Sequence, residues 1–132
     1  MQTTIVLSTT KKQEIIDITG KIREIVSSLN IKEGLCNVYT QHTTTSIIVN
    51  ENYDPNICID FLAALEKLIP SGKWKHDKVD NNADAHIKAG IVGSSNTLPI
   101  KDSNLLLGQW QAIMFCEFDG PRENRKIVIT VI

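Results

Sequence analysis

The sequence predicts a mixed α+β fold in a single domain that spans residues 1–132. Short runs rich in Thr, Ile and Val alternate with turn residues, which is typical of strands. Only two longer segments repeat apolar residues at the spacing of an amphipathic helix. Most connections between successive strands are short, which favours antiparallel pairing over parallel crossovers. A chain of this length can bury one sizeable core without disulfides or metal.

The first half of the chain contains four expected strands and one helix. The strands are expected at residues 3–9, 13–18, 35–41 and 45–50. Between the second and third, Thr19 can cap a helix from Gly20 to about Ser28. Its buried face is expected to carry the apolar side chains of Ile22, Ile25, Val26 and Leu29.

A second helix has clear boundary signals. Asp54 suits the N-cap and Pro55 suits the first helical position, while Pro70 and Gly72 end the helix. A polar loop is expected over residues 71–83, followed by a short helical segment that Asp84 can cap.

The remainder of the chain is expected to form strands at residues 96–100, 104–107, 110–118 and 125–132. The resulting order is β-β-α-β-β-α-β-β-β with one further edge strand. The last strand is nearly continuous in apolar residues, so both of its faces require cover, either inside the fold or from another subunit.

Charge and hydropathy give no support for a nucleic-acid or membrane partner. The chain has 14 basic and 15 acidic side chains, and no run of Lys or Arg, so a sequence-independent grip on phosphate backbones is not expected. The apolar stretch Ile5–Leu7 is too short for a signal-peptide core or a membrane span. The three widely spaced cysteines are typical of buried, reduced thiols. We therefore expect a cytoplasmic protein.

The three histidines, His42, His76 and His86, lie at the edges of expected elements beside polar residues. Three neutral imidazoles around one ion, with water completing the shell, form the open arrangement of catalytic zinc. The spacings are long, and no HxH or HExxH pair places two ligands on one element. Three unrelated surface or capping histidines therefore stay open as the alternative.

Two glutamates follow apolar strands. Glu51 is placed to orient an imidazole or to act as a general base. Glu117 either pairs with Arg122 or Arg125 or joins a polar site. The small-residue loop from Gly90 to Asn96 offers backbone N–H groups and hydroxyls to an anion, although an ordinary helix stop explains its second glycine equally well.

Several segments together resemble the signatures of the YjbQ-like family. The first is His42-Thr43-Thr44-Thr45-Ser46 with Asn50-Glu51-Asn52 and Asp54-Pro55. The second is Ala85-His86-Ile87-Lys88 with Gly93-Ser94-Ser95 and Pro99. The third is Leu107-Gly108, Trp110-Gln111, Cys116-Glu117 and Asp119-Gly120-Pro121-Arg122. They occur in order across almost the whole chain, which makes the set much more specific than any one match.

The resemblance implies two packed, mainly antiparallel sheets with two helices, assembled as a homotrimer. It also implies a secondary thiamine-phosphate synthase activity, which joins a hydroxymethylpyrimidine diphosphate to a thiazole phosphate and releases pyrophosphate. The expected partner is therefore a small phosphorylated metabolite. Two departures bear on this: Gln109 stands where Thr often precedes the Trp, and Glu123-Asn124 interrupts the basic run that usually follows the Pro.

On this resemblance we expect a divalent metal on His42, His76 and His86, and three imidazoles suit zinc better than magnesium. Glu51 or Glu117 would orient ligands or accept protons. Phosphate oxygens would be met by Lys88, Gly93, Ser94, Ser95 and Arg122. Two alternatives remain: a zinc hydrolase of a small phosphorylated metabolite, and a non-catalytic metal- or ligand-binding trimer.

Overall fold

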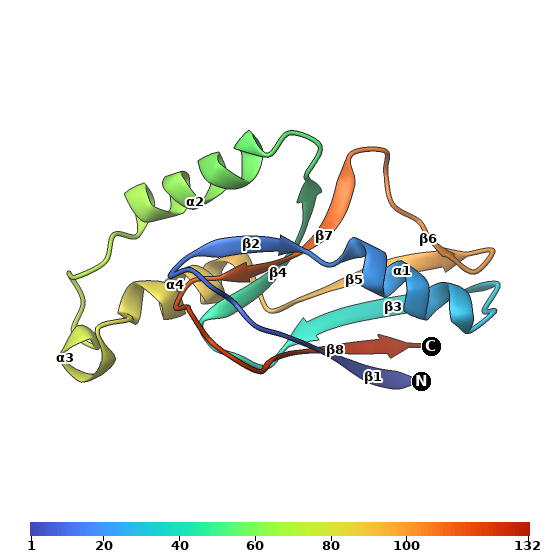
Figure 1. Cartoon of the computed structure of the whole chain (residues 1–132), viewed down its shortest axis with the longest axis horizontal. Helices are drawn as coiled ribbons and strands as arrows, with labels where there is room; N and C mark the ends of the chain where they lie inside the picture. Colours follow the sequence, from blue (N-terminus) through green and yellow to red (C-terminus); the bar gives the residue numbers. More distant parts are fainter.

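The computed structural model describes residues 1–132 and shows eight strands and four helices (Figure 1). The strands are β1 (Gln2–Leu7), β2 (Glu14–Asp17), β3 (Glu33–Thr40), β4 (Thr45–Glu51), β5 (Ser95–Lys101), β6 (Asn104–Leu105), β7 (Gln111–Glu117) and β8 (Arg125–Val131). The helices are α1 (Thr19–Ser28), α2 (Asn56–Leu68), α3 (Asp77–Asp80) and α4 (Ala83–Val92). The predicted α+β class is confirmed; α3 was not expected, and α4 takes the place of the short helical segment predicted near Asp84.

The strands form two antiparallel sheets. The larger sheet has the order β1-β8-β3-β5-β6, and the smaller has the order β2-β7-β4. In the smaller sheet Thr45 lies opposite Glu117 and Glu51 lies opposite Gln111. This register fixes which side chains meet at each end of the molecule.

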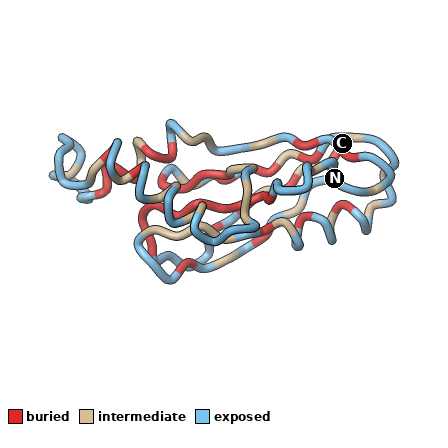
Figure 2. Tube along the Cα trace, turned by 90° about the horizontal axis from the view of Figure 1, so that it is seen from above, coloured by how far each residue is buried: buried red, intermediate tan, exposed pale blue.

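The elements stack in layers around two apolar cores. The main core lies between the larger sheet and the layer made by α1 and the smaller sheet, and strand β7 contributes Ile113 and Phe115 to it. The opposite face of β7 contributes Cys116 to a second core beneath α2 and α4. In Figure 2 the buried residues follow the strands through the middle of the molecule. Strand β7 thus has both faces covered, which fits its continuous apolar run from Ala112 to Cys116.

The single turn of α3 and the extra length of α4 have local causes. Within the expected loop, the Asp77 carboxylate accepts the backbone N–H groups of Trp74 and Ala83, both at 3.0 Å, and this closes the single turn of α3. Helix α4 is longer than predicted, and Asp84 lies inside its first turn rather than at its cap. Its carboxylate pairs with the ammonium of Lys88, four residues later.

Two predicted caps have different outcomes. Helix α2 begins one residue later than predicted, with Pro55 at the N-cap position, and the Asp54 carboxylate accepts the N–H of Asn56 at 2.9 Å beside the helix start. Thr19 is not the cap of α1, because its hydroxyl instead accepts the N–H of Ile113 at 2.9 Å and ties the helix to β7.

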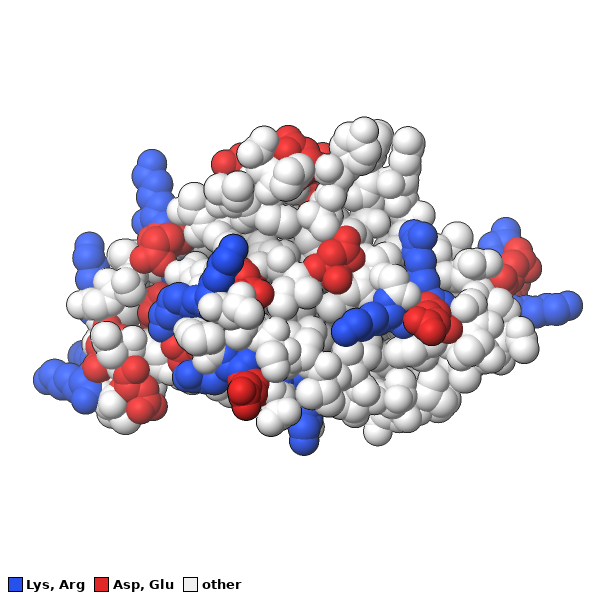
Figure 3. All heavy atoms as spheres, in the orientation of Figure 1, with Lys and Arg blue, Asp and Glu red and all other residues white.

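Strand β8 lies between β1 and β3, and only one of its faces is fully covered within the chain. Ile127, Ile129 and Val131 are buried, whereas Lys126 is exposed and Val128 is half-buried. No helix is long and apolar enough to cross a membrane. On the face seen in Figure 3, basic and acidic side chains are interspersed rather than gathered into a patch of one sign.

Candidate functional site

A cleft of about 380 Å³ opens where the loop between β3 and β4 meets helix α4. We call it the histidine cleft; it is lined by His42, Thr43, Thr45, His86, Ala89, Gly90, Gly93 and Ser94. His86, Ala89 and Gly90 belong to α4, and the last two follow His86 by three and four residues, so they share one face of that helix. The structure thus brings together two of the predicted histidines and part of the predicted small-residue loop.

His42 is held in one orientation by the backbone. Its Nε2 accepts the N–H of Lys126 at 2.9 Å. Burial, with the positive charge of Arg125, lowers the pKa of His42, so the ring is neutral at pH 7. A neutral imidazole that accepts at Nε2 carries its proton on Nδ1. His42 therefore offers the cleft a hydrogen-bond donor and no free lone pair.

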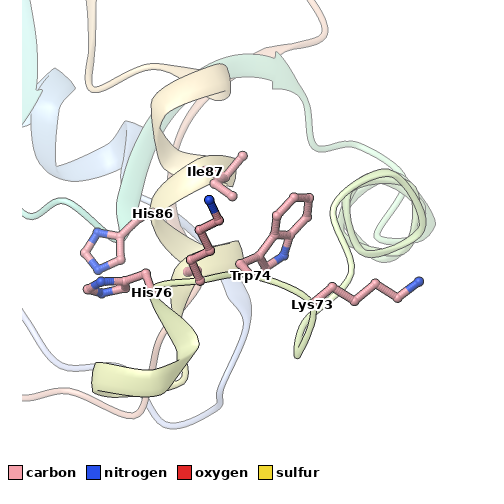
Figure 4. A pocket seen from close by; sticks show the side chains of 7 residues that line it. Lys73, Trp74, His76, His86 and Ile87 are labelled. Carbon is pink, nitrogen blue, oxygen red and sulfur yellow. The ribbon is translucent and has the colours of Figure 1, made fainter.

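The other two histidines meet in an adjoining pocket of about 630 Å³, which we call the Trp74 pocket; it is lined by Lys73, Trp74, Lys75, His76, Ala83, His86 and Ile87. The rings of His76 and His86 lie edge to face, with centroids 5.1 Å apart. Figure 4 shows this pair on one side of the pocket and Trp74 with Ile87 on the other, while Lys73 points away. His86 lies in the walls of both pockets and links them.

The three imidazoles do not form a single set of metal ligands in this chain. No group of three His, Cys, Asp or Glu side chains is close enough to hold one ion. His76 and His86 face each other, but the lone pair of His42 is engaged by the Lys126 amide. The donor set therefore does not fit a three-imidazole zinc centre within one subunit.

Glu117 is fully buried and paired, so it is placed to support the site rather than to react. Its carboxylate accepts two hydrogen bonds from Arg125, at 2.8 and 2.6 Å, and one from the Thr9 hydroxyl at 2.7 Å. Arg125 also donates to the Thr44 hydroxyl at 3.0 Å. Of the alternatives left open, the pair with Arg125 is the one that forms. It anchors the loop that carries His42.

Glu51 lies at the other end of the smaller sheet from Glu117. Strand β4 runs from Thr45, opposite Glu117, to Glu51, opposite Gln111. Six residue steps along a strand span about 20 Å. The two predicted catalytic glutamates therefore cannot serve one site within a subunit, and neither lines the histidine cleft.

The predicted phosphate-binding residues also separate. Lys88 has no exposed side-chain area, and its ammonium pairs with Glu66 and Asp84. This pairing is the largest cause that lowers the pKa of Glu66, to about 2. Lys88 is thus a structural ion in the second core, not a free cation. A phosphate would have to displace both carboxylates to reach it.

Arg122 is half exposed and donates to Asp119 at 3.1 Å, outside the two pockets. Gly93 and Ser94 line the histidine cleft, whereas Ser95 begins β5 and does not. The left-handed φ of Gly93, +104°, turns the chain at the end of α4, where a side chain would be strained. The Ser94 and Thr43 hydroxyls have no hydrogen-bond partner within the chain, so both are available to a ligand.

The sequence analysis predicted His76 and His86 of the Trp74 pocket but not Trp74 itself. Trp74 stands between Lys73 and Lys75 in a segment that reads as an exposed loop. The structure fixes the indole through its Nε1–H, which donates to the Pro70 carbonyl at 2.7 Å. A large aromatic residue between two cations in a polar loop is the signal that could have indicated a ligand site.

Comparisons with known proteins agree on one family. A family model described as UPF0047 protein YjbQ-like matches residues 3–132. A UPF0047 protein of Archaeoglobus fulgidus is 49% identical over 92% of this chain and 94% of its own. The UPF0047 protein YugU of Bacillus subtilis is 38% identical, over 92% of both chains.

Solved structures match at similar strength. A YbjQ-like protein of unknown function from Sulfolobus solfataricus superposes with a TM-score of 0.95 at 34% identity, over 99% of this chain and 95% of that one. An uncharacterised YjbQ/UPF0047 protein from Clostridium acetobutylicum gives a TM-score of 0.93 at 40% identity, over 98% and 99%.

Proposed function

Since the chain belongs to the YjbQ-like UPF0047 family, we propose that it binds a small phosphorylated metabolite in the histidine cleft and the Trp74 pocket and performs thiamine-phosphate synthase-type transfer there. The observation that carries this proposal is the position of His86 in the walls of both pockets. A planar ring beside Trp74 and a phosphate in the cleft would then contact one continuous surface.

The lining groups support an anionic ligand. The His42 ring donates through Nδ1–H, and the Ser94 and Thr43 hydroxyls are unengaged. Lys75 lines the adjoining pocket, and its ammonium has no ion pair or hydrogen bond within the chain. Donors and cations fixed in advance around a leaving diphosphate stabilise the charge that develops on it.

The proposed reaction needs little proton transfer. The bond between the pyrimidine methylene carbon and the diphosphate oxygen breaks, and the oxygen leaves with the electron pair. The thiazole nitrogen then uses its lone pair to form the new carbon–nitrogen bond. The Trp74 ring would stabilise the transient positive charge on the pyrimidine side. No proton is removed from the nucleophile, so the position of Glu51 and Glu117 outside the cleft is compatible with this chemistry.

The zinc expectation stays a prediction, and the chain supports it only at the His76–His86 pair. The metal content of protein purified without added metal would test it. Zinc that is retained in His42→Ala and lost in His86→Ala would assign the metal to this pair. Zinc that is lost in His42→Ala would restore the three-histidine site.

The direct test of function is incubation with both thiamine precursors while thiamine phosphate formation is followed. We expect product from the wild-type protein and a much lower kcat/KM in His86→Asn, because this change removes the ring that joins the two pockets. Asp60→Asn, at an exposed position of α2 away from both pockets, is the surface control and should be unchanged. The absence of product from wild-type protein would contradict the proposal.

A non-catalytic ligand-binding protein is the second candidate, and the absence of a carboxylate from the cleft favours it over a hydrolase, which needs a general base or an activated water. Binding of the pyrimidine diphosphate without turnover would support this candidate.

We also propose that the working unit is a homotrimer. The outer face of the larger sheet exposes Val6, Leu35 and Tyr39, which lie beside the half-buried face of β8. Light scattering on the purified protein measures the mass directly. A monomer at micromolar concentration would contradict this assembly.

A further inference from the structure

A third cavity, of about 490 Å³, lies at the opposite end of the smaller sheet from the histidine cleft. We call it the Trp110 pocket. It forms where the start of α1 meets the segments that enter β7 and leave β4, and Gln111, one of its lining residues, pairs with Glu51 at that sheet end. Its volume falls in the range of small-molecule sites. It shares no residue with the two pockets already described.

One wall of the Trp110 pocket is an exposed aromatic pair. The rings of Tyr53 and Trp110 lie edge to face with centroids 5.0 Å apart, and the residues are 78% and 52% exposed. Large aromatic surfaces left open beside a cavity are suited to contact with a planar ring. The aromatic wall therefore selects the shape of a ligand.

The lining of the pocket includes a fixed hydrogen-bond acceptor. The Asp17 carboxylate accepts the Thr19 N–H at 2.9 Å and the Asn52 amide at 2.8 Å. Burial acts to raise its pKa, but these hydrogen bonds and the charge of Arg23 lower the pKa of Asp17 overall, so the group is ionised. Each carboxylate oxygen can accept more than one hydrogen bond, so Asp17 retains acceptor capacity for a ligand N–H.

Positive and neutral donors line the same pocket. Arg23 lines it and has no hydrogen bond or ion pair within the chain. Gly20 also lines it, and its N–H lies in the unpaired first turn of the ten-residue helix α1. The carboxamide of Gln109 is likewise without a partner in the chain. Arg23 and the Gly20 N–H would accommodate an anionic substituent. The Gln109 carboxamide would accommodate a ring edge that carries both hydrogen-bond donors and acceptors.

From this combination we propose that the Trp110 pocket binds a planar nitrogen heterocycle that carries an exocyclic amino group and a phosphate, as cytosine and adenine mononucleotides do. The ring lies against Trp110 and Tyr53, the amino group donates to Asp17, and the phosphate meets Arg23 and the N–H of Gly20. Carboxylates read the amino group of cytosine in this way in other settings. The proposal does not depend on the function proposed for the histidine cleft.

Amide NMR spectra of the full chain test it, with cytidine and uridine monophosphates as one matched pair of probes and adenosine and inosine monophosphates as the other. The amino nucleotides should shift the indole N–H signal of Trp110. The indole of Trp74, bonded to Pro70 in a separate pocket, gives a distinct signal that reports any binding there. The keto partners should bind at least about fivefold more weakly, since a well-placed hydrogen-bonded pair gives a discrimination of this order.

Two variants separate the roles of the groups. Asp17→Asn should abolish the preference for cytidine over uridine monophosphate, because the amide can donate to the keto oxygen. Arg23→Gln, at an exposed position, should remove the preference for cytidine monophosphate over cytidine. Equal binding of the amino and keto nucleotides, shifts confined to Trp74, or an unchanged preference in Asp17→Asn would overturn the proposal.

Discussion

Replacing Glu117 with glutamine removes the negative charge from a carboxylate that solvent does not reach. The guanidinium of Arg125, also buried, then loses its counter-ion and faces an amide N–H₂ group. The Thr9 hydroxyl and the Asp119 N–H donate to the same carboxylate, at 2.7 and 3.2 Å, so the whole network is disturbed. Breaking a buried pair by removal of one partner costs about 3–5 kcal/mol.

Urea unfolding followed by tryptophan fluorescence measures this loss as a change in the free energy of unfolding. A double replacement, Glu117→Leu with Arg125→Met, removes both charges and should cost less than the single change. The exposed pair of His76 and Asp80, at 3.9 Å, is the matched control, and Asp80→Asn should cost under about 1 kcal/mol. If Glu117→Gln costs no more than Asp80→Asn, the buried pair does not support this end of the fold.

Three further predictions follow from single residues. Gly120→Ala should destabilise the fold by more than about 2 kcal/mol, because its Cβ would lie 2.0 Å from the Lys11 carbonyl oxygen. Gly90→Ala should be neutral or slightly stabilising, because open space surrounds Gly90. Equal effects of the two changes on urea unfolding would refute the steric argument. Because the pKa of His42 is lowered in the folded chain, the unfolded chain takes up the proton first, and the free energy of unfolding should fall as the pH drops below about 6.5. His42→Asn should make this fall with pH less steep. An identical pH profile in the variant would contradict the lowered pKa of His42. Burial raises the pKa of the Cys36 thiol to about 11 and that of the Cys116 thiol to about 12. Only half-buried Cys58 should therefore react with a thiol reagent at pH 8 in the native protein. Three rapidly reacting thiols would contradict the described core.

Much of the fold could be predicted because its strands and hairpins carry local signals. The period of two along a strand puts Ile113 and Phe115 on one side of β7 and Cys116 on the other, and these residues do join different cores. Helix α3 could not be predicted in this way, because a single turn depends on the carboxylate of Asp77 reaching the Trp74 amide. Propensity over four residues contains no such information.

The site was less accessible to sequence reasoning, because its geometry depends on register and burial. Glu51 and Glu117 both follow apolar strands, but the pairing of β4 with β7 places them at opposite ends of the sheet. Lys88 resembles a phosphate-binding cation in the sequence, yet the second core surrounds it and Asp84 neutralises it. The convergence of His42 and His86 was expected from the family resemblance, and the fold supplies the cleft that joins them.

The central claim is that the histidine cleft and the Trp74 pocket form one surface for a phosphorylated ring compound. Titration of the labelled full chain with hydroxymethylpyrimidine diphosphate, followed by amide and indole NMR shifts, tests it most directly. We predict shifts at Thr43, His86 and Ser94 together with the indole of Trp74, all lost in His86→Asn. Shifts that include only one of the two pockets, or none in either, would contradict the account.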